Sequence, residues 1–397
     1  MRINLSNQHT ILDDQSVVQR VNALLIDAIE KCASDIHLEQ TQDHLRVRFR
    51  VDGMLIDQKP FAAHLSSSII ARLKILAQLN IAERRIPQDG KFQINHNKNC
   101  IDIRISTFPA LHGEKMVVRI LDRLLQNITV ESLGFTPEML VTFKHLMQRQ
   151  NGFFLVTGPT GSGKTTTLYA ALSFLNNPEK NIVTLEDPVE YSLDGITQAH
   201  VQQAVGFTFE KGVRALVRQD PDIIMIGEIR DKISARIAIE AALTGHLVLS
   251  TLHTASAPGA LMRLMDMAVE PFLINAALSG ILAQRLVRKL CVECREQKRA
   301  TAEEKELLRS FGVHPIDVVY HAKGCDACDN LGYKGRVGIF ELLEISPELR
   351  SLVIKNPQFD VLCKQAMQDG MKALSYDGAL KVKEGIISLE ELMRVVV

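Results

Sequence analysis

The sequence contains no tryptophan, and only 5 of its 397 residues are tyrosine. Single-stranded nucleic acids stack on aromatic side chains, so this scarcity argues against a protein that binds them. The charges also balance, with 46 basic and 46 acidic residues, whereas a dedicated nucleic-acid binder usually carries a basic excess. We therefore expect no nucleic-acid partner.

Long hydrophobic runs are also missing. No apolar segment of signal-peptide length stands at the N-terminus, and the most apolar stretch, residues 272–287, is interrupted by Asn275, Ser279 and Gln284. We expect a cytoplasmic protein that touches a membrane only through a partner. With 46% hydrophobic and 23% charged residues, a chain of 397 residues is long enough for two or three globular domains.

Four of the seven cysteines form two close pairs. Cys291 and Cys294 make one C-x-x-C pair, and Cys325 and Cys328 make the other. In a reducing compartment, two thiolate pairs on tight turns satisfy a tetrahedral Zn²⁺ with no open position. We therefore predict a structural zinc site held by these four residues. A redox dithiol is the alternative, although a single C-x-x-C pair would suffice for it.

A glycine-rich stretch lies between an apolar strand pattern at residues 153–156 and an apolar helix pattern that begins near Thr165. It fits G-x-x-x-x-G-K-[ST], in which glycines let several backbone N–H groups converge on a phosphate chain. We predict that a nucleoside triphosphate binds here, with Lys164 at the β- and γ-phosphates and the Thr165 hydroxyl on Mg²⁺. The predicted binding residues are Gly158, Pro159, Thr160, Gly161, Ser162, Gly163, Lys164, Thr165 and Thr166.

Strand and helix patterns alternate from this loop to about residue 251. This alternation predicts an α/β domain with a mainly parallel sheet and helices on both faces. Two helical segments are expected next, at residues 256–267 and 271–289. A further helix is expected over residues 302–311, between the cysteine pairs.

We predict a separate α+β domain over residues 13–121. Amphipathic helix patterns begin at Gln15 and at about residue 65, the second ending near residue 79, and short strand patterns lie between and after them. The expected domain boundaries are a leader at residues 1–12, a linker at residues 122–136 and a second domain at residues 137–397. Within the second domain, residues 288–345 form the tetracysteine zinc subdomain and residues 346–397 a C-terminal helical region.

Carboxylates follow two of the predicted strands. Residues 223–227 lead into Glu228, and residues 181–185 lead into Glu186. A carboxylate at the C-terminal end of a strand beside a phosphate loop can orient an attacking water or hold Mg²⁺ through water. We predict this role for Glu228 and a supporting role for Glu186, for which turn formation at Asp187-Pro188 is the alternative. His253 ends another strand and could hydrogen-bond the γ-phosphate, although a lone histidine is more often structural.

Five motifs in this order resemble the secretion ATPases of bacterial type II secretion and type IV pilus assembly. They are the phosphate loop, the acidic box Glu186–Glu190, the segment Arg218–Asp231, the histidine box Thr244–Thr254 and the four cysteines. Shorter matches lie at residues 34–37, 49–53, 87–90 and 112–114. The resemblance therefore extends from about residue 16 to the end of the sequence.

The resemblance implies a PAS-like N-terminal domain, a RecA-like P-loop motor domain with a tetracysteine zinc insert, and ATP, Mg²⁺ and Zn²⁺ as cofactors. It also implies a ring of identical chains, usually hexameric, beneath an inner-membrane platform. Functional arginines of the N-terminal domain correspond to Arg104 and Arg119. A guanidinium brought to the γ-phosphate by domain closure would neutralise the charge that develops in the transition state.

The predicted function is a cytoplasmic ATP hydrolase, peripheral at the inner membrane, that assembles a pseudopilus in type II protein secretion. A type IV pilus assembly ATPase is the close alternative. Assembly motors usually begin with a further platform-docking domain, whereas the first predicted helix here begins near Gln15. Retraction motors lack the four cysteines, which favours an assembly or secretion motor. Two alternatives of another class are a nucleotide-gated scaffold and a nucleic-acid translocase.

Overall fold

The computed structural model describes residues 2–4, 16–97, 99–121, 128–355 and 357–396. The chain divides into two compact units, residues 1–126 and 127–397. The expected leader at residues 1–12 lies outside the described residues, except for Arg2–Asn4, which forms β1. The structure describes the expected linker, residues 122–136, from residue 128 onward. Val130 of this segment is buried in a core of the second unit.

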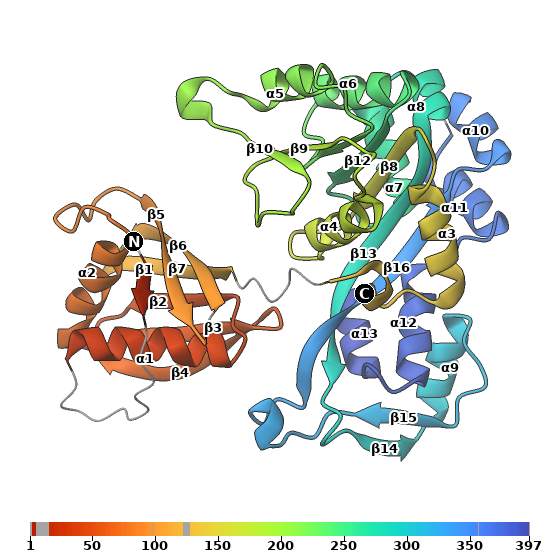
Figure 1. The fold of residues 1–397 in the computed structure, drawn as a ribbon. Helices are drawn as coiled ribbons and strands as arrows, with labels where there is room; N and C mark the ends of the chain where they lie inside the picture. The colour runs from red at the N-terminus through yellow and green to blue at the C-terminus, as the bar shows by residue number, and fades with distance from the viewer. Residues whose placement is uncertain (1, 5–15, 98, 122–127, 356, 397) are drawn as a thin grey trace. The chain divides into compact units, whose positions relative to one another are not determined.

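The first unit is a seven-stranded sheet with two helices packed on one face (Figure 1), the α+β arrangement that the sequence predicts. The strand order is β1-β5-β6-β7-β2-β3-β4, and all neighbours are antiparallel except β1 and β5. The strands are β1 (Arg2–Asn4), β2 (Asp35–Gln40), β3 (His44–Val51), β4 (Met54–Ala62), β5 (Gln88–His96), β6 (Asn99–Ala110) and β7 (Gly113–Leu121), and the helices are α1 (Val17–Glu30) and α2 (Ser66–Leu76).

Local sequence explains these elements. Helix α1 begins with a capping box, in which the Ser16 hydroxyl accepts from the backbone N–H of Gln19 and the Gln19 side chain accepts from that of Ser16. In β3, alternate apolar residues point into the core, while Arg46 and Arg48 face outward and pair with carboxylates. The hairpin from β3 to β4 turns at Asp52 and Gly53, both of which have positive φ.

The second unit is built on a mainly parallel seven-stranded sheet. Its strand order is β10-β9-β11-β12-β8-β13-β16, and the edge strand β16 alone in this sheet is antiparallel to its neighbour. Its strands are β8 (Gly152–Thr157), β9 (Ile182–Glu186), β10 (Thr197–His200), β11 (Ile223–Ile226), β12 (Leu247–Leu252), β13 (Leu278–Leu290) and β16 (Tyr333–Glu344). This arrangement confirms the predicted α/β class.

Helices cover both faces of this sheet. One face packs against α3 (Pro137–Met147) and α4 (Lys164–Leu175) in one apolar core. The other face packs in a second core against α5 (Phe209–Leu216), α6 (Lys232–Leu243), α7 (Ala257–Asp266), α8 (Pro271–Ala277), α10 (Pro347–Ile354) and α11 (Phe359–Gln368). The carboxyl ends of the parallel strands therefore share one edge of the sheet.

The expected helix at residues 271–289 is wrong. Only Pro271–Ala277 is helical, and the chain continues as the thirteen-residue strand β13. The first seven residues of β13 are all buried, because the strand lies between β8 and β16 and is covered on both faces. A continuous apolar run has no period that separates a buried strand from a buried helix.

The tetracysteine region lies at the far end of β13 and β16, as Figure 1 shows. It contains the two-stranded sheet of β14 (Glu296–Arg299) and β15 (Val318–His321) and the helix α9 (Ala302–Ser310), close to the helix predicted there. The C-terminal helices α12 (Leu374–Lys383) and α13 (Leu389–Val396) pack with α9, β13 and β15 in one core.

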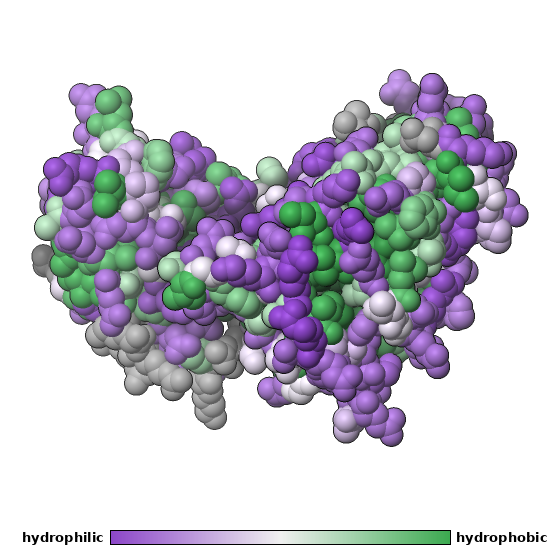
Figure 2. Space-filling view, turned by 90° about the horizontal axis from the view of Figure 1, so that it is seen from above, coloured by the Kyte–Doolittle hydropathy of each residue, from purple (hydrophilic) through white to green (hydrophobic). Residues whose placement is uncertain are grey.

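Among the described residues, no helix combines the length and the apolar character that a membrane span requires. The face seen in Figure 2 is mainly hydrophilic, but hydrophobic residues gather over the middle of the second unit. The large apolar side chains with the greatest exposure include Leu111 on the first unit and Val205 and Val292 on the second. Exposed apolar residues of this kind are common on folded proteins.

Candidate active site

The phosphate loop joins β8 to α4. Its glycines are needed, since Gly158, Gly161 and Gly163 all have positive φ, and a Cβ on Gly158 would lie 2.5 Å from the Gln284 carbonyl oxygen. Helix α4 begins at Lys164, so the first turn directs its N–H groups and its positive dipole end at the loop. Thr165 and Thr166 lie in that first turn, where a magnesium ligand is predicted.

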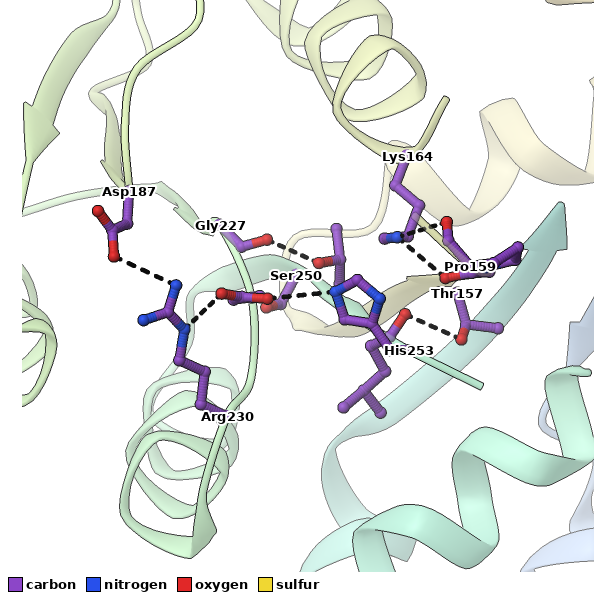
Figure 3. Close-up of polar contacts among 12 residues, drawn as sticks. Thr157, Pro159, Lys164, Asp187, Gly227, Arg230, Ser250 and His253 are labelled. Atoms are coloured by element: carbon purple, nitrogen blue, oxygen red, sulfur yellow. Dashed lines mark hydrogen bonds and ion pairs between the residues drawn. The ribbon is translucent and has the colours of Figure 1, made fainter. Parts of the chain in front are cut away.

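The Lys164 side chain lies inside the loop and is 9% exposed. Its Nζ donates to the carbonyl oxygens of Gly158, at 2.9 Å, and Pro159, at 3.0 Å (Figure 3). Burial lowers the pKa of Lys164, nearby Glu228 opposes this shift, and Arg285 adds to it. The ammonium group therefore lies in the position where a triphosphate-binding lysine is expected and within electrostatic reach of Glu228.

Gln284 of β13 fixes the loop from the neighbouring strand. Its Nε2 donates to the Ser162 carbonyl oxygen at 2.7 Å, and its Oε1 accepts from the Thr167 hydroxyl at 2.9 Å. The Gln284 side chain is almost fully buried. One amide thus ties the loop to the first turns of α4. In the sequence, Gln284 is visible only as a polar residue inside an apolar run.

Glu228 and His253 are brought together at the carboxyl edge of the sheet. Glu228 follows β11 and His253 follows β12, and His253 Nε2 lies 3.2 Å from Glu228 Oε2. The two strand ends are held in register because the Thr251 hydroxyl donates to the Gly227 carbonyl oxygen at 2.7 Å. The pairing follows from the positions of the two residues at the ends of adjacent parallel strands.

Arg230 completes the cluster around Glu228. Its Nε donates to Glu228 Oε1, and its Nη2 lies 3.2 Å from Oδ2 of Asp187, which follows β9 (Figure 3). One guanidinium thus links carboxylates at the ends of two adjacent strands. Sequence reasoning missed this role for Arg230 and Asp187, although both residues lie within motifs that it identified.

Glu186 lies elsewhere and is almost fully buried. Its carboxylate accepts hydrogen bonds from the Thr184 hydroxyl at 2.6 Å, from Gln198 Nε2 at 3.2 Å and from the Tyr169 hydroxyl. Burial raises the pKa of Glu186, although these donors oppose the shift. The bonds from Tyr169 and Gln198 connect β9 to α4 and to β10, the bond from Thr184 lies within β9, and a catalytic role for Glu186 stays a prediction.

Arg104 and Arg119 lie in the first unit, directly opposite each other on β6 and β7. Arg119 Nε donates to Asp35 Oδ1 at 2.9 Å. Both arginines line one surface pocket with Asp89 and Lys91. The structure therefore groups the two arginines, and their action at a γ-phosphate stays a prediction.

The four paired cysteines converge in the second unit. Their sulfur atoms all lie within 4.8 Å of one another, with Cys291–Cys325 at 3.9 Å and Cys294–Cys328 at 3.8 Å. Zn–S bonds of about 2.3 Å in a tetrahedron place sulfur atoms about 3.8 Å apart, so this donor set fits zinc. Burial alone would raise the pKa of Cys328, but backbone N–H groups, including that of Gly332, lower it to about 7.

Nearly the whole chain matches one known protein family. Residues 10–394 match the family model described as "Type II/IV secretion system protein". The chain belongs to this family.

Relatives within the family support the assignment. The chain is 47% identical to the "Type II secretion system ATPase E" of Vibrio cholerae over 387 residues, which cover 96% of this chain and 76% of that protein. It is 46% identical to the "Type II secretion system protein E" of Pseudomonas aeruginosa, with the same coverage. These matches confirm the predicted resemblance to secretion ATPases and the classification as an ATP hydrolase.

Two solved structures have a similar fold over nearly the whole of this chain. The pilus retraction motor PilT with bound ADP has a TM-score of 0.61 and 25% identity, over 94% of this chain and 95% of that one. The Legionella pneumophila ATPase DotB has a TM-score of 0.68 and 18% identity, over 99% and 98% of the two chains. The second likeness concerns the fold alone.

Proposed function

We propose that this chain is the ATP-hydrolysing motor of a type II protein secretion system. The observation that carries the proposal is the Glu228–His253 pair beside a phosphate loop that contains Lys164. A nucleotidase needs both parts, since the loop binds the triphosphate and a nearby carboxylate acts on the attacking water. The names of the relatives favour secretion over pilus assembly.

In this proposal, the loop N–H groups and Lys164 bind the phosphates, and the Thr165 hydroxyl is a ligand of Mg²⁺. Glu228 accepts a proton from water while the water oxygen bonds to the γ-phosphorus and the bond to the β–γ bridging oxygen breaks. His253 hydrogen-bonds the γ-phosphate. Arg104 and Arg119 supply positive charge from the first unit to the transition state.

Zinc, partners and location complete the proposal. The Cys291, Cys294, Cys325 and Cys328 cluster holds one structural Zn²⁺, for which its sulfur spacing is suited. The motor forms a ring, usually hexameric in this class, and acts in the cytoplasm at the inner membrane through platform proteins. Its work is the assembly of a pseudopilus.

The test is the Mg²⁺-dependent ATPase activity of the full chain and of Glu228→Gln. We expect the variant to lose about 100-fold or more in kcat, because it cannot accept the proton, and to keep its affinity for a fluorescent ATP analogue. The matched control is Glu240→Gln, since Glu240 pairs only with Arg236 on the surface of α6 among the described contacts. Full turnover by Glu228→Gln would exclude this mechanism.

Two further outcomes separate the alternatives. Nucleotide binding and assembly with negligible turnover, even with the platform protein added, would favour a nucleotide-gated scaffold. DNA-stimulated, salt-sensitive turnover would favour a nucleic-acid translocase. Deleting the coding gene and measuring secreted enzymes and surface pili separately would distinguish secretion from type IV pilus assembly.

A further inference from the structure

Arg230 is the feature of the active site that the proposed function leaves without a role. Its guanidinium donates to Glu228 Oε1 and lies 3.2 Å from Asp187 Oδ2. The ring of Phe209, at the start of α5, lies 5.7 Å from its Cζ. Three segments that are distant in the sequence therefore meet at this one side chain.

The backbone beside Arg230 is also held firmly. Asp231 caps α6, because its carboxylate accepts from the backbone N–H of Ser234 at 2.8 Å, and the Ser234 hydroxyl completes the capping box. The backbone N–H of Ile229 donates to the Thr251 carbonyl oxygen at 2.9 Å. Arg230 thus extends from a fixed backbone toward Glu228, as an anchoring group must.

The two oxygens of Glu228 have different partners. Oε1 meets Arg230, a guanidinium that stays charged at every physiological pH, while Oε2 lies 3.2 Å from an imidazole that can exchange partners. If His253 turns to a γ-phosphate, as proposed above, Oε2 is released and Oε1 remains held. The carboxylate would then keep its orientation while one oxygen becomes available to water.

We infer that Arg230 is a positioning residue for hydrolysis, which anchors Oε1 of Glu228 so that Oε2 receives the proton of the attacking water. Asp187 has the secondary role of holding the other side of the guanidinium. Without Arg230, the Glu228 side chain regains its rotational freedom and faces the Asp187 carboxylate with no cation between them. This inference rests on the proposed function, because it requires that Glu228 be the proton acceptor.

The experiment compares Arg230→Ala and Arg230→Lys with Arg236→Ala in the full chain. Arg236 is an exposed arginine whose described partner is Glu240 on the same helix, which makes it a matched control. We expect Arg230→Ala to lower kcat about 10- to 100-fold, the cost of a misplaced reacting group, with KM and ATP-analogue affinity within about 2-fold of wild type. Arg230→Lys keeps the positive charge but lacks the planar, two-sided donor geometry of the guanidinium. Its kcat should therefore lie between those of Arg230→Ala and the wild type.

Chemical rescue separates positioning from general structural support. Added guanidinium chloride, at concentrations that leave the wild type folded, should restore part of the lost kcat in Arg230→Ala and nothing in Arg236→Ala. Unchanged kcat in Arg230→Ala would overturn the inference. A loss of kcat that guanidinium does not relieve would also overturn it, as would a loss of nucleotide affinity equal to the loss of kcat. A wild-type protein that does not hydrolyse ATP would instead refute the proposed function.

Discussion

Replacing Gln284 is the sharpest test of how the phosphate loop is held. Gln284→Ala removes the partners of the Ser162 carbonyl oxygen and the Thr167 hydroxyl, and both residues are at least 97% buried. Each polar group left buried without a partner costs about 1–3 kcal/mol, so the two together cost about 2–6 kcal/mol. Gln284→Met loses the same bonds but leaves a smaller cavity, and it isolates the hydrogen-bond contribution.

The assays are thermal unfolding and equilibrium binding of a fluorescent ATP analogue. At about 2 °C or more per kcal/mol for a unit of this size, the midpoint should fall by about 4 °C or more in both variants. If about 1.4 kcal/mol of the cost falls on the loop conformation that binds phosphate, nucleotide affinity falls about tenfold. The control is Gln365→Ala, since the Gln365 amide donates to Asp369 at the surface. A wild-type midpoint and affinity in both Gln284 variants would refute the reasoning.

Two further predictions concern the tetracysteine region and its contact with α13. Metal analysis of reduced protein should find one zinc per chain in the wild type and in Cys363→Ser but little in Cys294→Ser, and unoxidised wild-type protein without zinc would contradict the site. Burial opposes the ionisation of Glu391, but hydrogen bonds from Arg394 and Arg288 lower its pKa from 4.5 to about 2. Its ionised form therefore contributes about 3 kcal/mol of stability above pH 4.5, which is lost as the pH falls toward 2. Acid unfolding should thus show the stability gap between wild type and Glu391→Gln closing over this range, and a constant gap would contradict the assignment.

The sequence predicts the phosphate loop well because its signal is local. Glycines at fixed positions, a lysine and a following helix suffice, and the structure has all of them in place. Glu228 and His253 could each be placed at a strand end beside the loop, but their pairing depends on the adjacency of β11 and β12, which the sequence pattern does not predict. Neither placement depends on side-chain packing.

Side-chain partners could not be predicted in the same way. Glu186 and Asp187 are adjacent in the sequence, yet the first is buried against α4 and the second reaches Arg230. Side chains at successive positions of an extended chain point to opposite faces. A shift of one position along the chain therefore decides which carboxylate reaches Arg230. Gln284 was hidden for another reason, because its strand reads equally well as a buried helix.

The long strand β13 has a mechanical consequence. Gln284, which hydrogen-bonds the phosphate loop, and Cys291, the first of the predicted zinc ligands, belong to one extended segment, since Cys291 directly follows β13. At about 3.3 Å per residue, the seven steps between them span about 23 Å. Pairing with β16 along this length stiffens the segment into an arm. We therefore expect a change in loop geometry at Gln284 to be transmitted along this segment toward the four cysteines, since the predicted nucleotide site and the predicted zinc site share one stiff element.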